Sequence, residues 1–344
     1  MVQDKIDFVV TWVDGNDPVW LKEKKQYEKQ AGLETLQSED ANSECRYRDF
    51  GFLRYWFRSI EKFAPWVNKV FFITCGQKPD WLNTSHSNLV CINHRDYIPD
   101  KYLPTFNSNT IELNLHRIES LSEQFVLFND DVFLLQPVSP RFFYHDGEPV
   151  LASSLRYPQN VDMNNWSRVA FNDYCLVNRN HDIAASIWKN RKKWFSVSSL
   201  TAHRALRNFL CYLANKSLPV GNYGHLAQPH LKSTLNVVWE KCPEALNRSS
   251  LHKFRSDEQV NQWLFCAWNQ AMGKFSPTIL NNRGGSLHIN PENLDLICQL
   301  IMQQEVPLIC LNDSPYTEDP EMCANRIASS FNQIFSERST FELY

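Results

Sequence analysis

Glycine is scarce in this 344-residue sequence, which contains only ten. Neither G-x-G-x-x-G nor G-x-x-x-x-G-K-[ST] occurs, so the chain has neither a dinucleotide-binding fingerprint nor a P-loop. No run of about 18 uninterrupted apolar residues occurs, so we expect no membrane-spanning helix. The first ten residues, MVQDKIDFVV, lack a basic segment followed by a long apolar one, and we expect a cytoplasmic protein without a secretory signal.

A strong excess of charge is also missing. The 35 Lys and Arg residues nearly balance the 38 Asp and Glu residues, and the formal net charge is −3. We therefore expect no nucleic-acid partner, although local basic groups could still bind a phosphorylated small molecule. Hydrophobic residues make up 43% of the chain, which is enough to build a sizeable core.

The ten cysteines form no C-x-x-C pair, which argues against a zinc ribbon and against a dithiol redox motif. They are scattered over the whole length of the chain. In a chain this long, we expect them to be reduced, half-buried thiols of a cytosolic protein.

Strand and helix patterns alternate through the first half of the chain. Runs of β-branched and aromatic residues predict strands at 6–12, 69–76, 88–94 and 124–130. Helical spacing of apolar residues, or a charged run that begins with proline, predicts helices at 18–30, 46–63 and 109–121. This alternation predicts an α/β fold with a mostly parallel sheet flanked by helices.

The second half of the chain is less regular. Four patterns there predict helices, at 181–195, 201–217, 230–242 and 257–272. We expect these helices to form a lobe that packs on the sheet.

Two adjacent carboxylates, Asp130 and Asp131, lie in the otherwise apolar string LFNDDVFLL at 127–135. An ionised carboxylate among apolar groups is costly unless it is paired or holds a metal. Ligands bind beyond the carboxyl ends of parallel strands, where this pair and Asp14 both fall. Because Mg²⁺ prefers a few carboxylates plus phosphate oxygens, the pair is a candidate metal site. A helix cap or a turn that holds two acids is the alternative.

Five other residues are candidates for binding or catalysis. Asp14, in TWVDGNDP, fits an Asp-Gly turn better than a ribose ligand. His230 could be a general base and Arg255 could grip phosphate oxygens, but a solvated helix start explains both patterns. Arg46 is an anion ligand or surface charge, and Arg117 fits an ion pair on a helix face.

Several strings together resemble the Stealth family. IDFVVTWVDGNDP (6–18), LRYWFRSIEKFAPWVNKVFFITCGQKPDWLN (53–83) and LPTFNSNTIELNLHRIESLSEQFVLFNDDVF (103–133) resemble its first two conserved regions. QPHL followed by SSLHKFRSDEQ resembles the third region, and ICLNDS with the closing STFEL resembles the fourth. The strings occur in the family's order and cover nearly the whole chain.

The family includes bacterial capsular polysaccharide phosphotransferases and the α/β subunit of the animal lysosomal-enzyme GlcNAc-1-phosphotransferase. The resemblance implies transfer of a sugar 1-phosphate from a UDP-sugar, such as UDP-GlcNAc or a similar hexose donor, to a glycan hydroxyl. UMP would be released, in capsule or exopolysaccharide synthesis. The resemblance also implies a Rossmann-like or GT-A-like fold and a divalent metal, Mg²⁺ or Mn²⁺.

The resemblance also implies one catalytic domain over residues 1–344. Residues 1–150 would form the nucleotide-sugar half, and residues 151–344 would form a mainly helical half for the acceptor and the phosphate. Peripheral association with capsule machinery at the inner face of the cytoplasmic membrane is expected. WKNRKKWF, at 188–195, is the basic and aromatic string that could contribute to it, although a solvated helix face or an acceptor-binding surface is the favoured interpretation.

Matched by motif, the resemblance assigns the site residues. The expected metal ligands are Asp130, Asp131 and Asp313. The expected catalytic residues are Asp131, His230 and Arg255. The expected substrate-binding residues are Asp14, Arg46, Arg117 and Asn129.

Two other functions stay open. A GT-A glycosyltransferase would release UDP, but such enzymes typically carry Asp-x-Asp, and this chain has Asn129-Asp130-Asp131. A non-catalytic glycan-binding module would use the 13% aromatic content for sugar stacking, although most of these residues lie at core-like spacing.

Overall fold

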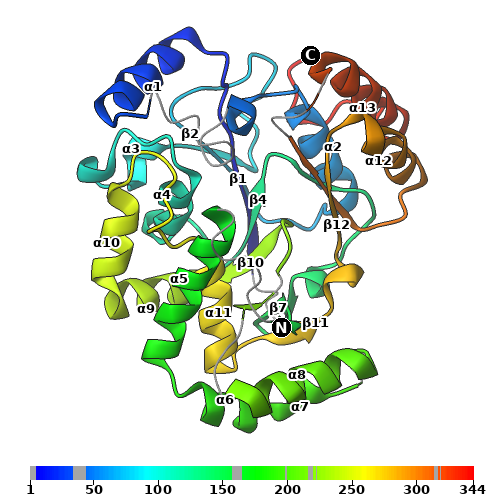
Figure 1. The fold of residues 1–344 in the computed structure, drawn as a ribbon. Helices are drawn as coiled ribbons and strands as arrows, with labels where there is room; N and C mark the ends of the chain where they lie inside the picture. The colour runs from blue at the N-terminus through cyan, green and yellow to red at the C-terminus, as the bar shows by residue number, and fades with distance from the viewer. Residues whose placement is uncertain are drawn as a thin grey trace.

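The centre of the protein is a five-stranded sheet with the order β10-β4-β1-β2-β3 (Figure 1). This computed structural model describes residues 5–33, 44–156, 165–197, 200–215, 220–221, 223–313, 317 and 319–344. The parallel strands are β1 (Ile6–Thr11), β2 (Val70–Thr74), β3 (Leu89–Asn93) and β4 (Gln124–Asn129). Strand β10 (Gln228–Leu231) pairs antiparallel with β4. The predicted α/β fold with a mostly parallel sheet is confirmed, and the order 3-2-1-4 of its parallel strands is of the Rossmann type.

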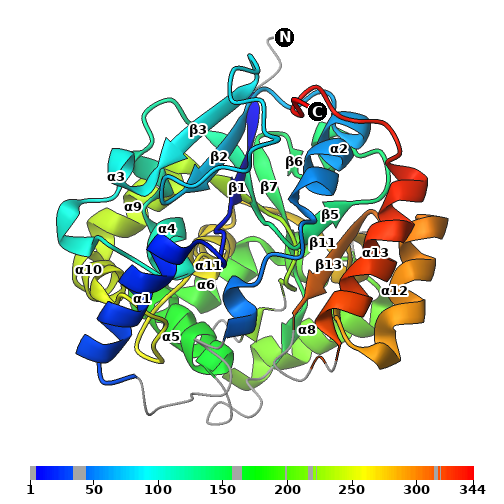
Figure 2. The same cartoon turned by 90° about the horizontal axis from the view of Figure 1, so that it is seen from above.

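Both faces of the sheet are buried, because successive side chains of a strand point to opposite sides. Phe8, Phe72 and Phe128 pack against α2 (Leu53–Phe63), α12 (Pro291–Gln303) and α13 (Pro320–Ile334). Val9 and Phe71 belong to the other core, with α4 (Ser108–Leu113), α9 (Lys232–Lys241), α10 (Pro243–Leu251) and α11 (Trp263–Met272). Figure 2 shows α2, α12 and α13 on one side of the sheet, and α9 and α10 on the other.

Two helices of the first half are shorter than the residue ranges predicted for them. Helix α1 (Pro18–Gln30) forms as predicted, but 46–63 gives a 3₁₀ turn and then α2, with Gly51 at φ 74° between them. The pattern at 109–121 gives α4 and a 3₁₀ turn. The α-helix stops at Asn114, whose side-chain amide donates to the Thr110 carbonyl at 2.8 Å.

The second half of the chain contributes strands as well as helices, and one of these strands joins the central sheet. Residues 228–231 form β10, so the helix predicted from 230 begins at Lys232. Helix α11 begins at Trp263 rather than at 257, because the Val260 N–H donates to Ser249 Oγ and the Asn261 N–H donates to Asp173. The pattern at 181–195 divides into α6 (Ile183–Lys189) and α7 (Arg191–Phe195), and the next one forms α8 (Ala202–Asn215), with 216–217 outside the described residues.

The remaining elements are short, apart from one helix that the sequence did not predict, α5 (Asn165–Asn180). A second sheet joins β5 (Val132–Leu134), β13 (Leu308–Asn312) and β12 (Gly284–His288). A third joins β6 (Tyr144–His145), β7 (Glu148–Ala152) and β11 (Ser276–Thr278), and β8 (Leu155–Arg156) pairs with β9 (Val220–Gly221). Helix α3 is His94–Tyr97, and the 3₁₀ turns are Glu44–Tyr47, Asp100–Tyr102, Leu115–Arg117, Pro140–Phe142 and Leu280–Asn282.

The helices that the structure describes do not include one with both the length and the apolar character needed to cross a bilayer. All ten cysteines are free thiols, and seven of them are buried.

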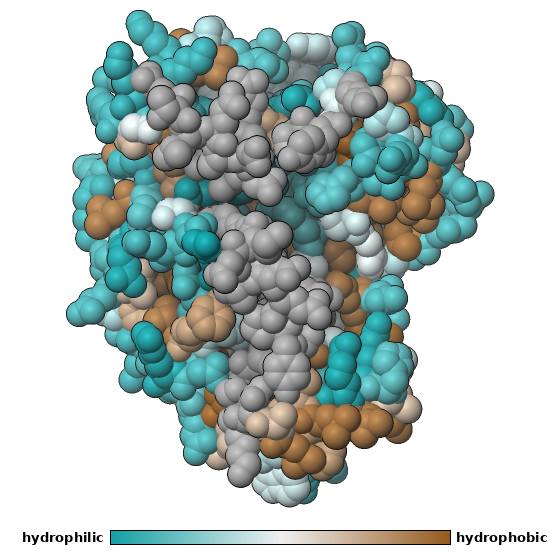
Figure 3. Space-filling view, in the orientation of Figure 1, coloured by the Kyte–Doolittle hydropathy of each residue, from teal (hydrophilic) through white to brown (hydrophobic). Residues whose placement is uncertain are grey.

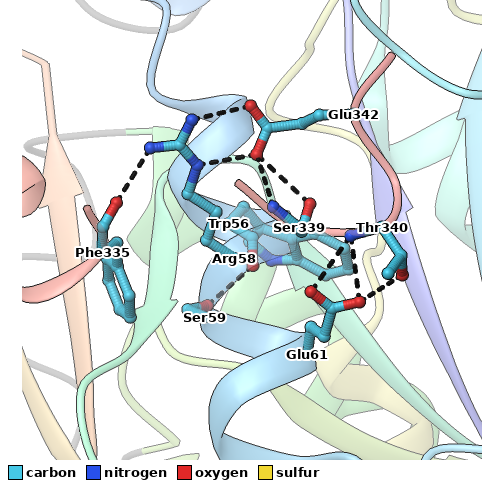
Figure 4. A network of polar contacts seen from close by, with 8 residues as sticks. All are labelled: Trp56, Arg58, Ser59, Glu61, Phe335, Ser339, Thr340 and Glu342. Carbon is cyan, nitrogen blue, oxygen red and sulfur yellow. Dashed lines mark hydrogen bonds and ion pairs between the residues drawn. The ribbon is translucent and has the colours of Figure 1, made fainter. Parts of the chain in front are cut away.

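A buried ion pair fastens the C-terminal segment to α2 (Figure 4). Arg58 donates from Nε and Nη2 to the two carboxylate oxygens of Glu342, at 2.7 Å each. Arg58 Nη1 also donates to the Phe335 carbonyl at 2.9 Å, and Glu342 accepts the Ser339 N–H. Both charged side chains are less than a tenth exposed. The pair therefore joins residues almost 300 positions apart, and all three guanidinium nitrogens of Arg58 donate hydrogen bonds.

We expect Glu342→Ala to lower the free energy of unfolding by about 3 kcal/mol, because it leaves the Arg58 guanidinium buried without its counter-charge. Urea unfolding followed by circular dichroism measures this. Glu337→Ala removes an exposed carboxylate from the same segment and is the control, with little expected change. Equal stability of the two variants would contradict a stabilising role for the pair.

Candidate functional site

A cavity opens at the carboxyl ends of β1 and β4, where the strand order reverses. Its floor includes Thr11 and Trp12 after β1 and Asn129, Asp130 and Asp131 after β4. The walls come from distant parts of the chain, among them Arg46, Arg48, Asp49, Glu112, His225, Arg255 and Asp313. Both halves of the sequence therefore contribute to one site.

The acidic pair forms a tight turn rather than the end of a strand. Strand β4 ends at Asn129, and β5 starts at Val132. The Leu311 N–H donates to the Asp131 carbonyl at 2.9 Å, which ties the turn to β13. Burial raises the pKa of the Asp130 carboxyl, and the neighbouring carboxylates Asp131 and Asp49 raise it further. The Asp130 carboxyl is thus held toward its neutral form.

Three potential metal ligands meet at Asp131. Ligand atoms of Asp131, His225 and Cys310 lie within 4.8 Å of one another. Among the described residues, no group donates a hydrogen bond to Asp131 Oδ1, although this oxygen is buried. The Asn129 amide lies 2.7 Å from His225 Nε2 and orients the ring. An orphaned carboxylate oxygen beside an imidazole and a thiol fits a divalent metal. The carboxylate suits Mg²⁺ or Mn²⁺, whereas the imidazole and the thiol suit softer transition metals.

Burial and the Asp131 carboxylate raise the pKa of the Cys310 thiol, so it stays protonated unless a metal displaces the proton. Asp313, the third expected metal ligand, forms an ion pair with Arg48 at 3.0 Å. Its carboxylate also accepts from Thr317 Oγ1 at 3.3 Å. Asp313 therefore lies at the cavity with its charge already balanced by the Arg48 guanidinium.

Basic groups and a buried acid form another wall of the cavity. Arg255 Nη2 donates to Ser108 Oγ, in the first turn of α4, at 2.8 Å. Burial lowers the pKa of Arg255, nearby Arg46 lowers it further, and Tyr47, Glu112 and Asp131 oppose the shift. Burial raises the pKa of Glu112 to about 7, against the opposing effects of Arg255 and Gln262. The cavity thus contains a carboxyl group that titrates near neutral pH.

Six of the expected site residues line this cavity: Arg46, Asn129, Asp130, Asp131, Arg255 and Asp313. Asp14, Arg117 and His230 do not. His225, Cys310, Glu112, Arg48 and Asp49 were not among the expected site residues, yet they lie at the cavity or within reach of Asp131.

His230 lies in the middle of β10, opposite Phe125, and is 1% exposed. Burial lowers its pKa to about 4, which makes it a weak base at neutral pH. Its Nε2 lies 3.1 Å from Gln262 Oε1, and Gln262 hydrogen-bonds Glu112 in turn. The structure therefore does not support His230 as the general base, because the strand QPHL points this side chain into the core.

Asp14 and Arg117 also have local partners. The Asp14 carboxylate accepts the Asn16 N–H at 2.9 Å, which is the turn that the sequence favoured over a ribose contact. A Cβ at Gly15 would lie 1.8 Å from the Tyr47 carbonyl oxygen, so this turn requires glycine. Arg117 donates to Asn114 at 2.9 Å and lies over the Trp239 ring, 4.7 Å from its centroid. We therefore assign no substrate contact to Asp14 or Arg117.

The fold and the cavity define an α/β protein in which a candidate metal-binding carboxylate and a buried arginine line one cavity at the carboxyl ends of parallel strands. Residues 4–32 match Stealth protein CR1, conserved region 1, and residues 46–150 match Stealth protein CR2, conserved region 2. The chain belongs to the Stealth family, as its motifs predicted.

Full-length relatives support this assignment. The chain is 39% identical over 340 residues to the capsular polysaccharide phosphotransferase WcwK of Streptococcus pneumoniae, covering 98% of this chain and 99% of that protein. It is 37% identical over 342 residues to the receptor polysaccharide phosphotransferase WefC of Streptococcus gordonii, covering 99% of each.

Solved structures are only distantly similar. The galactosyltransferase LgtC aligns over 95% of both chains with 10% identity and a TM-score of 0.38. The bifunctional glycosyltransferase WbbM aligns over 96% of this chain and 50% of its own, with 8% identity and a TM-score of 0.40. Scores this low support no conclusion about mechanism.

Proposed function

We propose that this protein transfers a sugar 1-phosphate from a UDP-sugar to a glycan hydroxyl and releases UMP, in capsule or exopolysaccharide synthesis. The observation that carries the proposal is one cavity with a metal-binding carboxylate, Asp131, and an arginine, Arg255, on different walls. Phosphoryl transfer mainly requires that the protein position the reacting groups and neutralise charge on the phosphate, and these side chains would do both. The names of the relatives, capsular and receptor polysaccharide phosphotransferases, agree with it.

Residues 1–344 would act as one catalytic domain. Asp131 comes from the first half of the chain, whereas His225 and Arg255 come from the second. Neither half alone contains the metal ligands and the phosphate-binding arginine together. This arrangement supports the proposed division into a nucleotide-sugar half and an acceptor half that complete the same site.

Asp131 would hold the divalent metal, Mn²⁺ or Mg²⁺, with His225 and Cys310 beside it. When bound, the metal would neutralise charge on the diphosphate of the donor. Asp130, with its raised pKa, and Asp313, with its Arg48 partner, would support the turn and the cavity wall. Asn129 would orient His225.

Arg255 would bind the phosphate oxygens, with Ser108 holding its guanidinium and Arg46 adding positive charge. Glu112 would take the proton of the acceptor hydroxyl. The new bond joins the acceptor oxygen to the phosphorus bonded to the sugar. The bond from that phosphorus to the UMP oxygen breaks, and UMP leaves. His230, through Gln262, would only position Glu112.

We expect kcat/KM to rise with pH through about 7 and to level off above it, because Glu112 accepts a proton only in its ionised form and its pKa is raised to about 7. Glu112→Gln should lose about 10²-fold in kcat/KM and flatten this limb of the profile. The pH profiles of both proteins test this, and Glu119→Gln, which changes an exposed carboxylate seven residues further along the chain, is the control. An unchanged acidic limb in Glu112→Gln would rule Glu112 out as the base.

Incubation with a panel of UDP-sugars, a glycan acceptor and Mn²⁺ or Mg²⁺, followed by mass spectrometry, tests the function. We expect UMP and a phosphodiester-linked product, and no product when EDTA removes the metal. Release of UDP would instead establish a glycosyltransferase. Binding of glycan without turnover would establish a binding module, which the burial of large aromatic residues such as Phe8, Phe72 and Trp56 in the cores disfavours.

The proposed partners are therefore a UDP-sugar donor and a glycan acceptor. We propose a cytoplasmic location, where nucleotide sugars are available, and contact with the inner face of the cytoplasmic membrane.

A further inference from the structure

Helix α8 carries an apolar stripe on its solvent-facing side. Leu206, Leu210 and Leu213 are 59%, 55% and 54% exposed, and Phe209 lies between them at 37%. The spacing i, i+3, i+4, i+7 places the four on one face of the helix. The opposite face, with Ala205, Asn208 and Cys211, is buried. Figure 3 shows the hydrophobic surface gathered at the bottom of the molecule, where Figure 1 places α8.

The exposed stripe is more than scattered surface leucines, because aromatic side chains extend it. Trp188, at the end of α6, is 53% exposed and stacks on Tyr212 of α8 with ring centroids 6.2 Å apart. Phe209 contacts Phe195 of α7 edge to face, at 5.5 Å. The apolar surface is thus continuous from α8 to the ends of α6 and α7. Surfaces of this kind mark contact sites.

The segment that carries this surface has charged side chains of one sign. The sequence from 183 to 239 contains no Asp or Glu. Lys189, Arg191 and Lys192 are exposed where α6 meets α7, and the Arg191 guanidinium lies 5.7 Å from the centroid of the Trp188 ring. Arg204 and Arg207 lie on α8 itself. Glu148 of β7 pairs with Lys193 of α7 at 2.7 Å, whereas the lysine and arginine side chains named above all belong to the segment that carries the stripe. An apolar stripe with these cations beside it is complementary to a surface that is both apolar and anionic.

We propose that α8, together with the α6–α7 junction, is a docking surface for an anionic lipid bilayer. The leucine stripe would enter the boundary between headgroups and acyl chains, Trp188 would lie at the headgroup level, and the lysine and arginine side chains would pair with lipid phosphates. A symmetric contact between two copies of this chain is disfavoured, because it would bring the lysine and arginine side chains of one copy against those of the other. Binding does not depend on the proposed reaction and is measured without turnover.

Flotation of the full-length chain with phosphatidylcholine vesicles, with and without phosphatidylglycerol, tests the proposal. We expect binding that requires phosphatidylglycerol and weakens with salt. The triple variant Leu206→Gln, Leu210→Gln, Leu213→Gln should lower vesicle binding at least about tenfold. The variant Lys189→Gln, Arg191→Gln, Lys192→Gln should lower it to a similar degree.

Leu296→Gln changes a leucine that is 45% exposed on α12 and is the matched control. It should bind vesicles like the wild type. The charge variant leaves the leucines in place, so it tests the proposal even if the leucine variant folds poorly. Two results would overturn the proposal: vesicle binding that neither variant lowers, or a wild-type dimer, seen by light scattering, that the leucine variant converts to a monomer.

Discussion

Asp131→Asn is expected to reduce kcat/KM for sugar-phosphate transfer by at least about 10³-fold. Asn keeps the shape of the side chain but removes the charge that holds the metal beside His225 and Cys310. The thermal unfolding midpoint should stay nearly unchanged. Asp131 Oδ1 has no hydrogen-bond donor among the described residues, and the Leu311 N–H contacts the main-chain carbonyl, which the substitution leaves in place.

Asp130→Asn distinguishes the contribution of Asp130 to activity from that of the adjacent Asp131. The raised pKa of Asp130 means that its carboxyl is held toward the neutral form, which an amide resembles, so we expect a much smaller loss. Asp146→Asn, in an exposed turn with φ 52°, is the control for the substitution itself. Mn²⁺ binding, followed by electron paramagnetic resonance, should weaken in Asp131→Asn only. An active Asp131→Asn enzyme would contradict the assignment of Asp131 as a metal ligand.

The fold and the acidic centre of the site follow from short stretches of sequence. The strands at 6–12, 69–76 and 124–130 were predictable because strands buried on both faces must be nearly all apolar. The edge strand at 88–94 is only partly buried but carries the same β-branched residues. Two acids at the end of such a strand conflict with that pattern and therefore mark a site. The local sequence pattern was therefore sufficient to predict those candidate site residues that directly follow a strand.

The rest of the site is assembled by long-range contacts that spacing does not encode. Cys310 is one apolar residue of the strand LICLN until β13 pairs with β5 and brings it to Asp131. Glu112 lies on a short amphipathic helix, where an acid normally faces solvent, yet it is 5% exposed in the folded chain. No periodicity signals either residue.

Two histidines of this region differ in their backbone context. His230 lies in the apolar strand QPHL, whereas His225 follows Gly224, which has φ 68°, in the turn before it. A turn at a strand end exposes a side chain to a ligand, and a strand interior buries it. The sequence motif indicated His230, whereas the contact of His225 with Asn129 of the Asn-Asp-Asp string depends on the folded turn.

Arg255→Ala is expected to lower kcat/KM by about 10³-fold, because phosphoryl transfer depends on an arginine that neutralises charge on the phosphate oxygens. The free energy of unfolding should not fall. Burial and the neighbouring Arg46 both lower the pKa of Arg255, because they disfavour its charged form. Keeping this guanidinium charged in the folded protein therefore reduces the free energy of unfolding. A loss of activity without a loss of stability is what distinguishes a residue kept for binding phosphate from one kept for packing.

Two comparisons sharpen this test. Arg255→Lys keeps the charge but loses the fork that reaches both Ser108 and the phosphate, so it should recover only part of the activity. Guanidinium ions added to Arg255→Ala should restore some transfer, since the vacated space faces the cavity, and they should have no effect on Asp131→Asn. Arg168→Ala, which breaks an exposed ion pair with Asp257 on the surface, is the matched control and should stay active. If Arg255→Ala instead unfolds more readily than Arg168→Ala and guanidinium restores nothing, Arg255 is structural, and the phosphate must be bound by Arg46 or Arg48 on the same cavity.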